Sequence, residues 1–170
     1  MPAIPDVGRG RSFPPGAQLR PGGANFCIYS KHAESMELVL FRDAAATSPS
    51  RVIPLSAPLH RTYHYWHVFV AGIERGQVYG WRARGPYDPD RGLRFDPGKL
   101  LLDPYARAIA VPEGYSRAAA CGPGDTTATA MKSVIADLDV PSRRVADARK
   151  GFASNDSLAL FKPLVVPELK

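Results

Sequence analysis

Apolar and polar residues alternate along several short stretches in the first half of the chain. In one of them, Ala24, Phe26 and Ile28 occupy one set of alternate positions, and Cys27 and Tyr29 occupy the other. A repeat of two residues is typical of a β-strand that turns one face toward a core. The same reasoning predicts further strands over residues 36–41, 51–55, 65–70 and 78–84.

Turn-forming residues separate these strands, and helical periodicity is weak through the first 110 or so residues. The 17 prolines and 15 glycines are many for 170 residues, and they favour short strands joined by turns over long helices. Pro54 removes a backbone donor, so the strand that contains it is predicted to lie at a sheet edge. Short strands at this spacing predict an all-β sandwich.

The chain changes character after residue 85. Four prolines within twenty residues restrict the backbone to extended geometry, which predicts an extended Pro-rich linker packed on the sandwich or on a neighbour. Residues 113–130 are small and polar and are predicted to be flexible, and residues 132–137 are predicted to form one more strand. In the tail, residues 142–150 are predicted to be a short helix between an N-cap serine and a terminating glycine; the rest is irregular.

Charge and cysteine content exclude several classes of protein. The net charge is +6, but the arginines are scattered rather than concentrated, so we expect a solvated surface and no nucleic-acid partner. Two cysteines far apart in the sequence predict no disulfide framework. No apolar run approaches the roughly 20 residues that span a bilayer, and the N-terminus lacks the apolar segment of a secretory signal. We therefore expect no membrane partner and a cytoplasmic location.

Several short motifs follow one another in a specific order. They are GGANF at 22–26, YSKHAE at 29–34, ELVLF at 37–41, WH at 66–67, GQVYG at 76–80, GPY at 85–87, GLRFDP at 92–97, KLLLDPYA at 99–106 and KSV at 132–134. In this order the chain resembles the N-terminal β-sandwich of bacterial glycogen debranching enzymes and isoamylases, which belong to glycoside hydrolase family 13. The resemblance covers about residues 9–139.

This resemblance implies an immunoglobulin-like carbohydrate-binding module of family 48, taken from enzymes that cleave α-1,6 branch linkages in glycogen. It divides the chain into an N-terminal extension (1–15), the sandwich with its linker (16–112), a segment leading toward a catalytic barrel (113–139) and a divergent tail (140–170). A (β/α)₈ barrel needs about 250 residues, and the residues after position 139 are too few to form one. The resemblance thus implies a non-catalytic α-glucan module whose barrel partner is normally in cis. Three origins of such a chain stay open: a truncated gene product, a frameshifted reading and a stand-alone module.

The sequence offers four carboxylates for glycoside hydrolysis, which needs two of them at a fixed separation across a cleft. Asp88, Asp90, Asp96 and Asp103 all lie in the linker. Asp96 and Asp103 each precede a proline and are predicted to cap turns through their side chains. We therefore predict no catalytic residue in this chain and no cofactor.

Three histidines raise the question of a metal site. His64 and His67 would project to opposite faces of one strand, and no cysteine lies near them or His60 to complete a ligand set. We expect no metal site, and we expect His67 at a surface or an interface.

Sugar-binding surfaces stack exposed aromatic rings on the apolar faces of sugar rings. The predicted carbohydrate-binding residues are Trp81, Tyr87 and Trp66. Trp81 and Tyr87 are the surface candidates, whereas Trp66, like Tyr79, occupies a position that usually fills a sandwich core. Tyr63 and Tyr65 are further aromatic candidates.

The alternative function is docking on another domain or protein without useful sugar affinity. The candidates for this role are Arg94, Phe95, Lys99, Asp103 and Tyr105. They combine apolar anchors with polar groups, as interdomain surfaces do.

Overall fold

Strands are the main regular elements of the computed structural model, which describes residues 6–136 and 159–160. The elements are β1 (Val7–Arg9), β2 (Gly16–Arg20), β3 (Gly23–Tyr29), β4 (Ser35–Phe41), β5 (Arg51–Leu55), α1 (Ala57–His60), β6 (Arg61–Thr62), β7 (Tyr65–Ala71), β8 (Val78–Arg84), β9 (Tyr87–Asp88), the 3₁₀ turn η1 (Pro89–Arg91), β10 (Leu93–Arg94), β11 (Ala108–Val111), α2 (Arg117–Cys121), β12 (Lys132–Val134) and β13 (Ala159–Leu160). The predicted all-β sandwich is confirmed.

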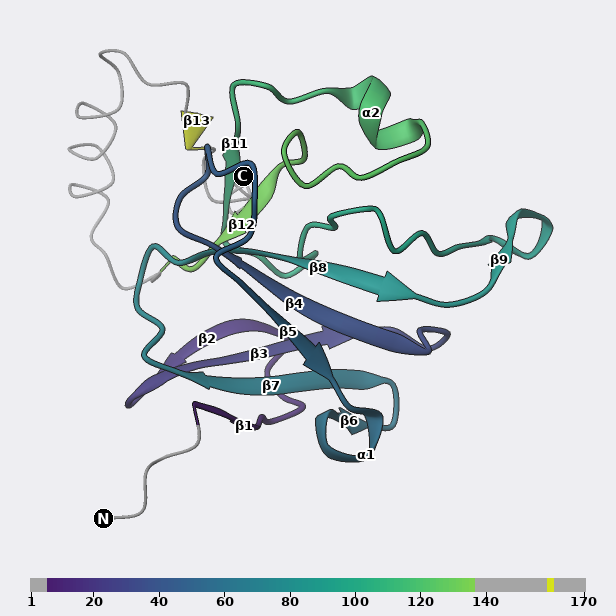
Figure 1. The fold of residues 1–170 in the computed structure, drawn as a ribbon. Coiled ribbons are helices and arrows are strands. Elements are labelled where there is room, and N and C mark those ends of the chain that lie inside the picture. Colours follow the sequence, from purple (N-terminus) through teal and green to yellow (C-terminus); the bar gives the residue numbers. More distant parts are fainter. Residues whose placement is uncertain (1–5, 137–158, 161–170) are drawn as a thin grey trace, which may run out of the picture.

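The strands form two antiparallel sheets and a small ribbon (Figure 1). The first sheet has the order β1–β7–β3–β2, with β6 also paired to β7, and the second has the order β13–β11–β12–β8–β4–β5. The ribbon pairs β9 with β10 beyond the end of β8. The five strands predicted from alternation appear as β3, β4, β5, β7 and β8. Pro54 lies in β5, which is at the edge of its sheet, as predicted.

The main core lies between the two sheets, and a second core lies on the opposite face of the second sheet. In β4, Met36 and Leu38 belong to the main core, whereas Val39 and Phe41 belong to the second. Strands that are buried on both faces read as continuous apolar runs, which accounts for the sequence of β4. The second core is completed by Leu100 from the Pro-rich segment.

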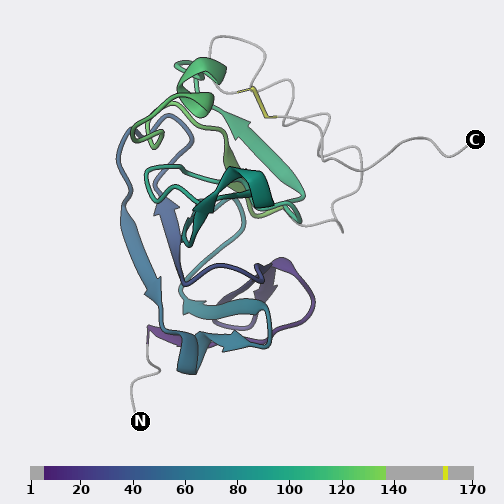
Figure 2. The same ribbon diagram turned by 90° about the vertical axis from the view of Figure 1, so that its right-hand side faces the viewer.

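Residues 96–107 and 112–131 pack on the outer face of the second sheet, and we call them the cover; β11 and β12, which they connect, belong to the sheet itself. Figure 2 shows its green part, with α2, on the side away from the purple N-terminal strands of the first sheet. Gly80 lets the cover approach closely, because a Cβ atom there would lie 2.8 Å from Leu100 Cδ1. Packing of the Pro-rich segment on the sandwich, one of two predicted arrangements, is observed. The segment 113–130, predicted to be flexible, contains α2. The strand predicted over 132–137 is observed as β12, which pairs with both β11 and β8.

Residues 10–15 cross the outer face of the first sheet, and we call them the strap. The Asn25 side chain accepts a hydrogen bond from the Arg11 amide (2.6 Å) and donates one to the Arg11 carbonyl (3.0 Å). The thiol of Cys27 donates to the Ser12 carbonyl at 3.2 Å. Burial under the strap raises the pKa of Cys27 to about 12. Because β1 precedes the strap and pairs with β7, the sandwich begins before residue 16.

Part of the predicted tail lies outside the described residues. The predicted helix at 142–150 and nearly all of the segment 140–170 fall there. The exception is β13, which pairs with β11.

Candidate functional site

Both tryptophans fill the main core. Trp66 in β7 and Trp81 in β8 are each 0% exposed. Trp81 shares its face of β8 with Tyr79, whose ring meets Phe26 edge to face at 5.1 Å. The prediction that Trp81 lies at the surface is wrong, because β8 is buried by the first sheet on one face and by the cover on the other. Neither indole presents a face to a sugar.

Tyr87 lies in β9, and its side chain is 72% exposed. The ribbon that carries it is closed by η1, in which Asp88 accepts a hydrogen bond from the Arg91 amide and Gly92 adopts a left-handed conformation. The predicted exposure of Tyr87 is therefore observed. Its contact with a sugar stays a prediction.

An aromatic cluster that we call the tyrosine end lies on the first sheet, and it consists of Tyr29, Tyr63, His64 and Tyr65. Tyr29 and Tyr65 are direct partners on β3 and β7, with ring centroids 5.3 Å apart. The His64 ring lies 5.9 Å from Tyr29 and 3.8 Å from Tyr63. Both Tyr29 and Tyr63 are exposed. The cluster forms a continuous set of rings open to solvent.

Tyr63 holds an unfavourable backbone conformation at this end. It lies between β6 and β7 with φ of 57°, and its side chain is 79% exposed. A bulky residue with positive φ pays about 1–2 kcal/mol that glycine or asparagine would largely avoid. Such strain is often stored at functional sites. The exposed ring gains no burial that would offset this cost.

The tyrosine end is bordered by basic groups. Arg61 donates hydrogen bonds to the backbone carbonyls of Tyr63 and Lys31, which fixes its guanidinium beside the cluster. Desolvation, with the nearby charges of Arg61, Lys31 and His32, lowers the pKa of His64. His64 is therefore neutral at pH 7, with one ring nitrogen able to donate a hydrogen bond and the other able to accept one.

Tyr87 and the tyrosine end lie at the same end of the molecule, at the right of Figure 1. The turn at 30–34 joins them, since the Ser30 amide donates to the His64 carbonyl and the Glu34 amide donates to the Arg84 carbonyl. Tyr63 and Tyr65 were sequence candidates, but Tyr29 was missed. The alternation in β3 already turned Tyr29 away from Phe26 and the core, so the signal was present.

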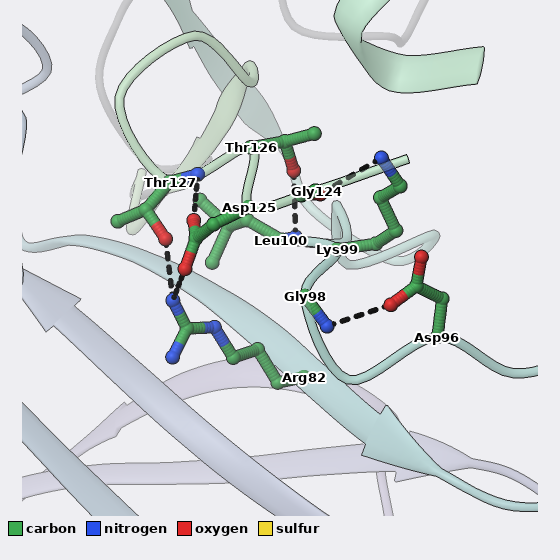
Figure 3. Close-up of polar contacts among 9 residues, drawn as sticks. All are labelled: Arg82, Asp96, Gly98, Lys99, Leu100, Gly124, Asp125, Thr126 and Thr127. Atoms are coloured by element: carbon green, nitrogen blue, oxygen red, sulfur yellow. Dashed lines mark hydrogen bonds and ion pairs between the residues drawn. The ribbon is translucent and has the colours of Figure 1, made fainter. Parts of the chain in front are cut away.

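Two predicted docking residues are used inside this chain. Lys99 Nζ donates to the backbone carbonyls of Ala119 and Gly124, both at 3.0 Å, and to that of Gly122. Figure 3 shows Lys99 among the polar contacts that join residues 96–100 to residues 124–127 and to Arg82. Arg82 completes this group through Asp125 (3.0 Å) and Thr127. The Lys99 contacts hold residues 119–124 against residues 96–100, and the Arg82 contacts fasten this group to β8. The Lys99 amino group is thus used inside this chain, and a docking role for it stays a prediction.

Asp103 is also internal, with 3% of its side chain exposed. Its carboxylate accepts hydrogen bonds from the Tyr79 hydroxyl and the Tyr105 amide, both at 2.8 Å, and its own amide donates to Ser133 Oγ at 2.9 Å. Burial raises the pKa of Asp103, and the bonds from Tyr105 and Tyr79 oppose this shift. A docking role for Asp103 is therefore wrong, since the carboxylate faces the core.

The other three docking candidates differ in exposure. Phe95 packs on the main core and meets Gly85, where a Cβ atom would lie 2.8 Å from its ring. Phe95 therefore serves this chain's own core. Arg94 is exposed, and Tyr105 is 41% exposed. Desolvation and the neighbouring Tyr65 raise the pKa of Tyr105, which indicates that Tyr105 lies near the tyrosine end. A docking role for Arg94 and Tyr105 stays a prediction.

The linker carboxylates are mostly engaged in turns. Asp96 accepts from the Gly98 amide at 2.8 Å and Asp103 accepts from the Tyr105 amide, so the predicted turn caps are confirmed.

His67 is buried and pairs with the Thr62 hydroxyl at 2.8 Å, so its predicted surface position is wrong. Within residues 6–136 and 159–160, no group of three histidine, cysteine or acidic side chains is placed to hold a metal ion. Both helices of the described part are too short to cross a bilayer.

The chain matches a known family over most of its folded part. Residues 14–106 match carbohydrate-binding module 48, the isoamylase N-terminal domain. The chain is 45% identical over 100 residues to the glycogen debranching enzyme of Yersinia enterocolitica, covering 59% of this chain and 14% of that protein. It is 38% identical over 133 residues to the enzyme of Cronobacter sakazakii, covering 75% and 19%. The chain thus spans less than a fifth of each relative.

Solved structures share the fold at low sequence identity. A pullulanase from Paenibacillus barengoltzii in complex with maltohexaose and α-cyclodextrin superposes with a TM-score of 0.53 at 20% identity, covering 82% of this chain and 17% of that one. The product complex of the glycogen-degrading pneumococcal protein SpuA gives a TM-score of 0.51 at 16% identity, covering 76% and 12%. At this identity the likeness concerns the sandwich alone.

Proposed function

The chain belongs to the family of carbohydrate-binding module 48, and from this premise we propose that it is a non-catalytic module that binds α-glucan at the tyrosine end. It would work in cis with a barrel that hydrolyses α-1,6-glucosidic branch linkages in glycogen, in the cytoplasm. The relatives named glycogen debranching enzymes support this reaction. The observation that carries the proposal is the exposed ring of Tyr63, carried on a strained backbone beside His64 and Tyr29.

The chemistry of an α-glucan suits this surface. Each glucose unit has an apolar face that packs on an aromatic ring and an edge of hydroxyls that exchange hydrogen bonds. Tyr63 and Tyr29 offer rings, and their hydroxyls offer donors and acceptors. Of the two nitrogens of the His64 imidazole, Nδ1 is buried, which leaves Nε2 for a contact with the sugar. Rings fixed by contacts with one another lose little conformational entropy on binding. Tyr87, at the same end, extends the proposed contact.

The experiment is affinity electrophoresis in gels containing glycogen, with the variant Tyr63→Gly. We expect the wild-type chain to be retarded and the variant to bind about five- to tenfold more weakly, since a lost ring contact is worth about 1 kcal/mol. Glycine also removes the strained backbone, so the free energy of unfolding should stay the same or rise by up to about 1 kcal/mol. A binding loss without a stability loss separates a ligand contact from a structural one.

The matched control is Tyr115→Ala, because Tyr115 is exposed in the cover, in the loop between β11 and α2, and both of these elements lie away from the first sheet (Figure 1). Tyr87→Ala is the second test, with an expected loss of a few fold. Equal retardation of wild type and Tyr63→Gly, or equal weakening by Tyr115→Ala, would contradict a site at the tyrosine end. Migration of the wild type without any retardation would contradict glucan binding itself.

A second candidate function is docking on a catalytic domain. It is favoured by the exposed side chains of Arg94, Leu101 and Tyr105 on the Pro-rich segment. Half-exposed apolar groups beside a charge are typical of an interdomain surface. In a chain extended by its barrel, Tyr105→Ser would then lower the thermal stability of the pair without changing glycogen retardation of the isolated module.

A further inference from the structure

A groove on the first sheet carries an unusual concentration of arginine. It has a volume of about 350 Å³ and opens beside the strap, away from the tyrosine end. Its lining consists of Arg9, Gly10, Arg11, Arg20, Pro21, Asn25 and Phe69. No carboxylate of the described residues belongs to this lining.

The three arginines reach the groove from different segments. Arg9 ends β1, Arg11 lies in the strap and Arg20 ends β2. All three are exposed, and within the described part of the chain none has an ion pair or a side-chain hydrogen bond. Their mutual repulsion is therefore unopposed by any described acid in the lining. A bound anion would relieve it.

The backbone between two of these arginines is held firmly. A Cβ atom on Gly10 would lie 2.6 Å from the Val68 amide nitrogen, so the strap lies directly on β7 at this point. The buried Asn25 side chain binds both backbone groups of Arg11. Asn25 and Phe69 are opposite partners on β3 and β7 and form the floor. The arginines therefore converge on a groove whose backbone is already in place, which lowers the entropic cost of binding.

We propose that this groove binds a phosphate-type dianion, either free or carried on a small sugar. Guanidinium groups match tetrahedral oxyanions through paired N–H donors, and three of them supply enough charge for a dianion. The half-buried Phe69 ring offers an apolar surface for a sugar attached to the phosphate. The volume lies at the lower end of the range for small-molecule sites. This site is separate from the proposed glucan surface and does not depend on it.

The test is isothermal titration at constant ionic strength with inorganic phosphate, glucose 6-phosphate and glucose as three separate ligands. We expect saturable binding of the two phosphates and none of glucose. The double variant Arg9→Gln with Arg20→Gln should bind at least about tenfold more weakly, as expected for the loss of two charged hydrogen-bonding groups. Tighter binding of glucose 6-phosphate than of phosphate would identify a sugar phosphate, and equal binding would identify the phosphate group alone.

The control for net charge is Arg117→Gln with Arg107→Gln, since both residues lie in the cover, Arg117 exposed and Arg107 half-buried. This pair removes the same two charges and should leave phosphate binding unchanged. Equal weakening by the two double variants, equal binding of glucose and glucose 6-phosphate, or no saturable binding of either phosphate would each overturn the proposal. Glycogen retardation of the Arg9, Arg20 variant should match the wild type, which keeps the two sites distinguishable.

Discussion

The outer faces of the two sheets differ in how completely the chain covers them. The second sheet lies under the cover, which brings Leu100 and other apolar side chains to the second core. Among the residues that the structure describes, the first sheet is crossed by the narrow strap alone, which buries Cys27 and Asn25 in its middle. The tyrosine end is open on one side of the strap, and the arginine groove is open on the other.

This difference explains which of the binding residues predicted from the sequence are accessible to a ligand. Polar groups near the closed face are used within the chain, as the three carbonyl contacts of Lys99 and the buried carboxylate of Asp103 show. On the first sheet, Asn25 and Cys27 are bound by the strap, whereas the rings of Tyr29 and Tyr63 and the arginines of the groove are exposed. Both proposed sites therefore lie on the sheet that the described residues leave partly uncovered, and each prediction below tests one part of this comparison.

The largest expected effect is that of Trp81→Ala, on the closed sheet. Removing a fully buried indole should lower the free energy of unfolding by about 3–5 kcal/mol, through lost burial and the cavity that remains. Urea denaturation followed by circular dichroism measures this change. Tyr87→Ala, a comparable truncation of an exposed ring, should change stability by less than about 0.5 kcal/mol. A near-neutral Trp81→Ala would mean that the two sheets do not pack closely around this indole in the main core.

The next effect concerns the strap, through Gly10→Ala. The added methyl group would meet the Val68 backbone and the Asn25 side chain, so the strap must move, at an expected cost of about 1–3 kcal/mol. A moved strap should also expose the Cys27 thiol. In a Cys121→Ser background, which removes the exposed cysteine, a thiol reagent should modify the Gly10→Ala variant faster than its parent. Gly8→Ala, where a Cβ atom meets nothing within 4 Å, is the control.

The sequence predicted the strands well but the exposure of single rings poorly. Alternation located β3, β4, β7 and β8, because a period of two residues depends only on the local chain. It also placed Trp81 and Tyr79 on one face. The burial of Trp81 depends on how the first sheet packs across β8 in the main core, a contact between distant segments that no local pattern encodes. The strap was not predicted, for the same reason: the contacts of Gly10 and Arg11 with Asn25 join segments that lie about 15 residues apart in the sequence.

A smaller effect should come from Lys99→Met, which keeps the aliphatic stem and removes the charged donor. Three backbone carbonyls of the cover lose their partner, and we expect a loss of about 1–2 kcal/mol. Hydrogen exchange should speed up first in residues 119–124. Lys31→Met, an exposed lysine next to the tyrosine end, is the control for loss of charge. If exchange rose equally across the first sheet, the Lys99 contacts would not be specific to the cover.

The smallest effect is a pH dependence that Asp103 imposes on the closed side. Burial raises its pKa in the folded state above the ordinary value of 3.8, so the folded chain holds this proton more tightly than the unfolded chain. The stabilising contribution is complete below that ordinary value and is lost as the pH rises through the raised folded pKa. The neutral variant Asp103→Asn has no proton to lose, so its stability relative to wild type should increase as pH rises from about 3 toward 7. Urea denaturation across this range measures the difference, with the exposed Asp90→Asn as the control for charge. A difference between wild type and Asp103→Asn that stays constant with pH would show that the carboxylate pays no cost for its burial beside Tyr79, and the closed face would then be open to water at this point.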